Sequence, residues 1–126
     1  MQIEYRDGLL FTEIEVVYNG KRKSIANIVV DTGASKTLIS QDSVDDIGIK
    51  VKREDEIVTS YGIGGKEHAF VKKIDKVSVG DYFAEEIALE FTVIQYEDIN
   101  GLLGLDLLMD AGFNINLKDL RMDLHG

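Results

Sequence analysis

The feature that most constrains this chain is an apolar run that leads one acid into a sharp turn. The run is Val29-Val30-Asp31-Thr32-Gly33-Ala34-Ser35, and Thr37-Leu38-Ile39 follows it. Two β-branched residues before Asp31 are typical of a strand buried on both faces, so we expect apolar surroundings that favour the neutral carboxyl group. Thr32 can hydrogen-bond locally through its hydroxyl, and Gly33 allows a close approach of backbone to a carboxylate or a ligand. These residue types together favour a rigidly held acid.

An Asp-Thr-Gly sequence occurs only once in the 126 residues. Two carboxylates about 3 Å apart cannot both ionise, so such a pair shares one proton and supplies a base and an acid at once. The chain is long enough for one domain and too short for two lobes that each contribute an acid. The simplest route to a pair is a two-fold axis between two copies, which would make dimerisation a condition of activity.

Most of the chain has the pattern of short β-strands separated by turns. Residues 9–18 alternate between two faces, Asn19-Gly20 favours a tight primed turn, and residues 24–30 return directly to Asp31. Further strands are expected at 57–61, at 69–79 and, after a turn at Gly80-Asp81, at 82–93. Short helices are expected at 41–46, ended by Gly48, and at 105–110, ended by Gly112. We predict one mainly β domain over residues 1–126.

Composition narrows the classes of partner. The net charge of −9 repels phosphate backbones and anionic lipid, so we expect neither nucleic-acid nor membrane binding. The chain has no cysteine, and charged residues interrupt positions 1–18, so neither a disulfide framework nor a signal peptide is expected. We expect a cytoplasmic protein without cofactor or metal. A calcium loop is not expected at Asp42, Asp45 and Asp46, because the glycine and the final acid of such a loop are missing. These acids are more typical of an exposed helix start.

Three segments, in the right order, resemble the retropepsins, the single-domain relatives of pepsin found in retroviruses, bacteria and eukaryotes. Residues 31–34 (Asp-Thr-Gly-Ala) resemble the active-site loop, and residues 61–65 (Tyr-Gly-Ile-Gly-Gly) resemble the tip of the flap. Residues 101–108 resemble the apolar-apolar-Gly segment and the short helix after it. The resemblance implies a closed β-barrel with one or two short helices, a two-fold homodimer, and an aspartic endopeptidase acting on peptide or protein substrates.

The same resemblance implies a role for individual residues. Asp31 would be the catalytic carboxylate, and Thr32 would join its two-fold mate in a hydrogen-bonded brace beneath the pair. Gly33 would support the site and offer backbone to the substrate. The implied substrate-binding residues lie in the loop, in the flap and in the side-chain pockets: Gly33, Ala34, Tyr61, Gly62, Ile63, Gly64, Gly65, Asn100 and Leu102.

The sequence also departs from the retroviral pattern. Retroviral members carry an acid in the loop that pairs with an arginine after the apolar-apolar-Gly segment, and here these places hold Ser35 and Leu105. The dimer must then be held differently, for which apolar contacts and the strand-like residues 114–124 are candidates. Tyr61 is more reminiscent of pepsin-like flaps, and its role stays open.

The same residues also allow other interpretations. A catalytically silent module that keeps the fold for dimerisation or peptide binding is the alternative function. Ser35 and His68 could suggest a hydrolase triad, but residues 33–37 lack the second glycine of a nucleophile elbow. Asp106 could pair with Asp31 within one chain, as in glycosidases, although its helical context favours a structural hydrogen-bonding role.

Overall fold

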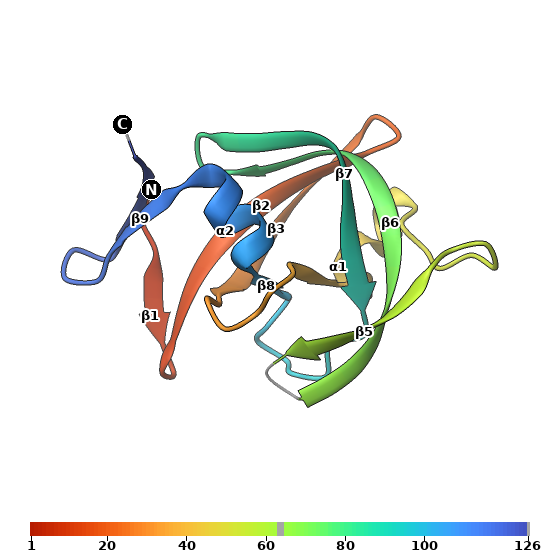
Figure 1. Ribbon diagram of the computed structural model, residues 1–126, viewed down its shortest axis with the longest axis horizontal. Helices are drawn as coiled ribbons and strands as arrows, with labels where there is room; N and C mark the ends of the chain where they lie inside the picture. Colours follow the sequence, from red (N-terminus) through yellow and green to blue (C-terminus); the bar gives the residue numbers. More distant parts are fainter. Residues whose placement is uncertain (63–64, 126) are drawn as a thin grey trace.

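The computed structural model describes residues 1–62 and 65–125 and is mainly β, as the sequence predicts (Figure 1). The strands are β1 (Glu4–Arg6), β2 (Leu9–Tyr18), β3 (Lys21–Val30), β4 (Leu38–Ser40), β5 (Ile57–Gly62), β6 (Gly65–Val79), β7 (Tyr82–Thr92), β8 (Gly101–Leu103), β9 (Phe113–Asn116) and β10 (Arg121–Leu124). The helices are α1 (Gln41–Val44), the 3-10 helix η1 (Asp45–Ile47) and α2 (Leu105–Ala111). None of the helices in the described ranges is long and apolar enough to cross a membrane.

One eight-stranded sheet contains most of the strands. Its order is β1-β2-β3-β8-β4-β7-β6-β5, and β2 also pairs with β6, so the sheet curves back on itself. Strand β8 runs parallel to β3, with Val30 opposite Leu103, and antiparallel to β4. The turn that follows β3 therefore lies beside the segment that follows β8.

The hairpins follow the expected turns closely. Strand β2 has the predicted bounds, and both turn residues have positive φ, 49° at Asn19 and 78° at Gly20, as a primed turn requires. Strand β6 begins at Gly65, earlier than the predicted residue 69, because it pairs with β5 as far as Gly62 opposite Gly65. Strand β7 ends at Thr92, one residue early.

The first predicted helix is only partly correct. The α-helix ends at Val44, and residues 45–47 tighten into the 3-10 helix η1 before Gly48, at φ 89°, ends the segment. The second helix is confirmed and runs one residue further than predicted, to Ala111. Gly112, at φ 68°, donates its backbone N–H to the carbonyl oxygens of Leu108 and Met109.

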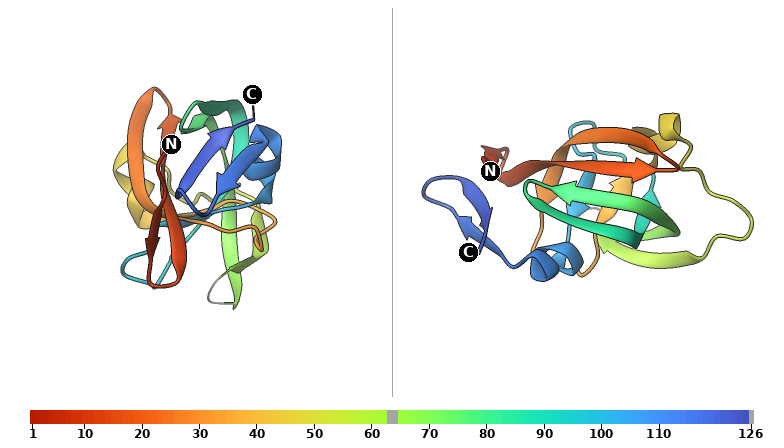
Figure 2. Two further views of the ribbon diagram at one scale, coloured as in Figure 1. Left: turned by 90° about the vertical axis from the view of Figure 1, so that its left-hand side faces the viewer. Right: turned by 90° about the horizontal axis from the view of Figure 1, so that it is seen from above.

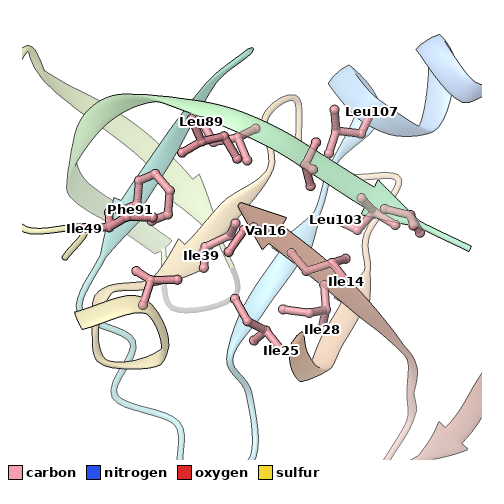
Figure 3. Packing of buried hydrophobic residues seen from close by; sticks show 14 of the residues in the cluster. Ile14, Val16, Ile25, Ile28, Ile39, Ile49, Leu89, Phe91, Leu103 and Leu107 are labelled. Atoms are coloured by element: carbon pink, nitrogen blue, oxygen red, sulfur yellow. The ribbon is translucent and has the colours of Figure 1, made fainter. Parts of the chain in front are cut away.

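The main core lies inside the curved sheet and under α2 (Figure 3). Its largest fully buried side chains include Phe91, Ile14, Ile28, Ile39 and Leu103. Each such side chain contributes about 1.5–3 kcal/mol by leaving water. A second, smaller cluster of buried residues lies nearer the turn after β3 and consists of Phe11, Val29, Ala34, Leu38, Ala69 and Leu102.

The C-terminal residues form a separate antiparallel pair, β9 with β10. The strand-like character predicted for residues 114–124 is thus confirmed, as a hairpin. The N-terminal residues lie alongside it, with Ile3 N–H donating to the Leu120 carbonyl oxygen at 2.9 Å and Met122 N–H donating to the Met1 carbonyl oxygen at 3.0 Å (Figure 2).

Candidate active site

The carboxyl group of Asp31 is oriented by the turn in which it lies. Asp31 N–H donates to the Leu103 carbonyl oxygen at 3.0 Å, which fixes the start of the turn to β8. Gly33 N–H donates to Asp31 Oδ1 at 2.9 Å, while Oδ2 has no hydrogen bond within the described residues. A Cβ at Gly33 would lie 3.2 Å from Oδ1, so a side chain there would crowd the carboxylate. The turn thus holds one carboxylate oxygen, and the other has no hydrogen bond within the described residues.

The surroundings of Asp31 are less apolar than the sequence suggests. Val29 is buried, but Val30 is only half-buried, and so is Asp31 itself. The expectation of a strand buried on both faces is therefore wrong at its last residue. The strand ends here, and Val30 packs only partly against the main core.

Backbone hydrogen bonds join the loop, residues 31–37, to the start of α2. Leu105 N–H donates to the Ala34 carbonyl oxygen at 2.8 Å, and Asp106 N–H donates to the Ser35 carbonyl oxygen at 3.2 Å. Gly104, the residue before Leu105, is packed against the backbone of the loop, because a Cβ there would be 2.6 Å from the carbonyl carbon and oxygen of Lys36. The loop and the helix are therefore packed backbone against backbone.

A side-chain network completes this connection. Asp106 Oδ1 accepts hydrogen bonds from Thr37 N–H at 2.9 Å and from the Thr37 hydroxyl at 2.7 Å. The Thr37 hydroxyl oxygen accepts the N–H of Gly104 at 3.0 Å. Thr37 is 1% exposed. The structural role predicted for Asp106 is confirmed, and Thr37 is a supporting residue that the sequence shows only as a polar position next to an apolar run.

Thr32 and Ser35 are exposed in the same loop. The Thr32 hydroxyl makes no hydrogen bond within the described residues, so the local bond that the sequence allows is not formed. Leu105, which stands where retroviral members carry the paired arginine, is half-buried. The loop thus presents Thr32 on the surface of the single chain.

The second apolar cluster packs against this loop and includes its residue Ala34. Leu102 is 3% exposed and packs in that cluster with Val29, Ala34 and Leu38. Asn100 is half-buried, and its side-chain amide donates to the Ala26 carbonyl oxygen at 2.9 Å. The predicted pocket roles of Leu102 and Asn100 are not tested by these contacts and stay predictions.

Strands β5 and β6 form a two-stranded arm beside the loop. They pair from Ile57 opposite Phe70 to Gly62 opposite Gly65, which places Tyr61 opposite Lys66. Strand pairing with β7 begins at Phe70, opposite Phe91, so no third strand pairs with residues 57–62 and 65–69 (Figure 1). The Thr92 hydroxyl of β7 still donates to the His68 carbonyl oxygen at 2.7 Å. Ile63 and Gly64 lie outside the described residues. The predicted hairpin is present, and its contact with a peptide stays a prediction.

Other candidate centres find no support in the geometry. Within residues 1–62 and 65–125, no three His, Asp or Glu side chains are arranged to hold a metal ion. Asp46, one of the acids near α1, pairs with Lys23 at 2.6 Å. His68 is exposed on β6 and shares no hydrogen bond with Ser35 in the described part of the chain.

Comparisons with known proteins agree with this geometry. A family model described as aspartyl protease matches residues 14–107, which include the loop, the arm and residues 103–106, which hold the loop. No curated protein matches the sequence. Among solved structures, the chain is similar to a retropepsin-like aspartic protease from Rickettsia conorii, with a TM-score of 0.64 and 23% identity over 96% of this chain and 86% of that chain. The fold is therefore retropepsin-like.

Proposed function

The chain belongs to the aspartyl protease family, and we propose that it is an aspartic endopeptidase whose catalytic pair is Asp31 of two copies in a homodimer. The observation that carries this proposal is the loop of residues 31–37. It holds one oxygen of a half-buried carboxylate through Gly33 and leaves the other unbonded within the described residues. A rigid, accessible acid is what a shared-proton pair requires from each subunit.

The reaction that such a pair performs needs no covalent intermediate. The ionised Asp31 takes a proton from a water molecule, and the water oxygen attacks the carbonyl carbon of the peptide bond. The protonated Asp31 of the second copy gives its proton to the carbonyl oxygen. Collapse of the tetrahedral intermediate breaks the C–N bond, and the amine leaves with a proton from the pair. The two carboxyl groups exchange roles, and the titration belongs to the pair.

The remaining residues are assigned around that pair. Thr32, exposed and without a hydrogen bond within the described residues, is free to meet its two-fold mate beneath the pair. Gly33 and Ala34 offer backbone to an extended peptide. The arm supplies the opposite wall through Tyr61, Gly62, Ile63, Gly64 and Gly65, because an extended peptide pairs readily with a glycine-rich strand edge. Asn100 and Leu102 line side-chain pockets.

Digestion of a peptide library by wild type and Asp31→Asn tests the proposal. We expect the substitution to leave the fold intact and to lower the rate at least about 10³-fold, because the pair loses its ionisable groups. Asp42→Asn, at an exposed acid in α1, is the matched control and should keep wild-type turnover. Specific activity should fall on dilution if the pair is shared between subunits.

Two results would count against this assignment. Turnover of Asp31→Asn near the wild-type rate would remove Asp31 from the chemistry. A wild-type protein that binds peptides and hydrolyses none of them, over several pH values and concentrations, would favour the non-catalytic binding module instead.

A further inference from the structure

A largely buried ion pair lies at the base of the β5–β6 arm. Lys72 Nζ is 2.6 Å from Asp55 Oδ2, and the two side chains are only 9% and 11% exposed. In every other ion pair of the described residues, at least one side chain is about half exposed or more. Exposed pairs contribute little, whereas breaking a buried pair leaves a charge without its partner. This pair is therefore placed where it can hold one part of the chain against another.

The acid of the pair fixes the segment that leads into β5. Asp55 Oδ2 also accepts the N–H of Lys52 at 2.7 Å, and Asp55 N–H donates to the Lys52 carbonyl oxygen at 3.0 Å, which closes a tight turn. Val71 N–H donates to the Glu56 carbonyl oxygen at 2.9 Å, one residue before β5 begins. The hydrogen bond from Lys72, followed by that from Lys52, lowers the pKa of the Asp55 carboxyl group, so the acid is charged at neutral pH.

The lysine of the pair lies in the body of the sheet. Lys72 lies on β6 opposite Leu89 of β7, two residues beyond the point where the third strand joins. Its ammonium group is 5.9 Å from the centre of the Phe70 ring, and Phe70 stacks on Phe91 at 5.6 Å. Asp55 thus anchors the entry of the arm to a residue that the sheet already holds.

We propose that Asp55 and Lys72 form a positioning pair that sets the direction in which the arm leaves the sheet. The arm is six residues long on β5, or about 20 Å at the usual rise of a strand. A rotation of about 10° at its base would therefore move its far end by roughly 3 Å. Misplacement of about 1 Å in a substrate-positioning element can cost 100-fold in rate. The inference rests on the proposed function, in which the arm contacts the peptide.

Two single substitutions, Lys72→Met and Asp55→Asn, remove one charge each. Lys72→Met keeps most of the apolar stem, and Asp55→Asn keeps an oxygen that can accept the Lys52 N–H. We expect backbone amides of residues 57–62 and 65–69 to exchange with solvent about ten times faster in both variants, while those of β2 and β3 stay unchanged. We also expect KM for an extended peptide to rise about tenfold, with a smaller change in kcat. Lys72→Arg, which keeps the positive charge, should leave both the amide exchange of the arm and KM near their wild-type values.

The Lys23–Asp46 pair provides the matched control. It has the same 2.6 Å separation but lies on the exposed surface, so Lys23→Met and Asp46→Asn should change neither amide exchange in the arm nor KM. Unchanged exchange in both test variants would overturn the proposal, and so would faster exchange with unchanged KM. A wild type that hydrolyses no peptide would contradict the proposed function instead, and amide exchange would still decide whether the pair holds the arm.

Discussion

The loop that carries Asp31 and the arm beside it are held in opposite ways. Asp31, Ala34, Ser35 and Thr37 are each hydrogen-bonded to β8 or to the start of α2. Over residues 57–62 and 65–69 the arm has strand pairing only between β5 and β6. Its further contacts lie near its base, where the Thr92 hydroxyl donates to the His68 carbonyl oxygen at 2.7 Å and Ala69 is buried in the second apolar cluster. One element is thus fixed along its length, and the other is fixed at one end.

This difference matches what the proposed function requires of each element. A catalytic acid has to stay within a fraction of an ångström of its productive position, which requires support from packed neighbours. An element that closes over a substrate has to change position at little cost, and such elements come from the less stable parts of a fold. The comparison is tested by making the same chemical change in both places.

The largest effect on stability is expected for Gly104→Ala, in the support of the loop. The new methyl group would lie 2.6 Å from two backbone atoms of Lys36 and 2.9 Å from the Ala34 carbonyl oxygen. Backbone cannot turn aside as a side chain can, so we expect a loss of about 3 kcal/mol or more in the free energy of unfolding. Urea unfolding at one fixed protein concentration measures it.

Lys36→Ala provides the control for that substitution. The Lys36 side chain is exposed, and the contact with Gly104 involves only its backbone. We expect a change within about 0.5 kcal/mol. A loss in Gly104→Ala no larger than that of Lys36→Ala would show that the loop can move away from α2, and the contrast with the arm would disappear.

A pair of threonine substitutions makes the comparison direct. Thr37→Val removes the hydroxyl group that donates to Asp106 and accepts from Gly104, leaving a buried N–H without a partner. We expect a loss of about 2–3 kcal/mol, since an unsatisfied buried donor costs its full desolvation. Thr59→Val makes the same change at an exposed position of β5 and should cost less than about 0.5 kcal/mol.

One outcome of the two threonine substitutions would contradict this prediction. Equal losses in Thr37→Val and Thr59→Val would mean that the network around Thr37 adds nothing beyond β-propensity. Thermal or urea unfolding of both variants side by side, with peptidase activity measured on the same samples, distinguishes the cases. Activity should fall in Thr37→Val, because Asp31 lies on the same loop.

Local features of the fold could be predicted from the sequence, because they depend on neighbouring residues. The strand of residues 9–18, the turn at Asn19-Gly20 and the helix end at Gly112 each follow from short patterns. The family motif likewise identifies Asp31 as a candidate without a structure. What could not be predicted depends on residues that meet only in three dimensions.

The bracing of the site is the clearest example. Thr37 and Asp106 are 69 positions apart, and Asp55 and Lys72 are 17 apart, so no local pattern connects either pair. Lys72 is one charged residue among several on β6, and only its burial distinguishes it. The 3-10 helix at residues 45–47 could not be predicted either, because the tightening of a helix end depends on what packs against it.

The smallest predicted effect concerns the far end of the helix that supports the loop. The Tyr82 hydroxyl, at the start of β7, donates to Asp110 Oδ2 at 2.6 Å. Tyr82→Phe removes this one hydrogen bond and leaves Asp110, which is exposed, to water. We expect a loss of about 1 kcal/mol at neutral pH with peptidase activity near that of wild type. Thr37 is bonded to Asp106, in the first turn of α2, and not to Asp110, so a large loss of activity would show that the whole helix, and not its first turn, holds the loop.

The pH dependence of that loss identifies its cause. Burial of the Tyr82 phenol, followed by its bond to Asp110, raises the pKa of the hydroxyl above its ordinary value of about 10. The folded state therefore keeps a proton that the unfolded chain releases, and the stabilisation is complete below about pH 10 and is lost as the pH rises above it. The difference in unfolding free energy between wild type and Tyr82→Phe should narrow over that range, while Tyr5→Phe, at an exposed residue, should show no such change. A difference that stays constant from neutral to alkaline pH would mean that lost packing, and not the hydrogen bond, accounts for the cost.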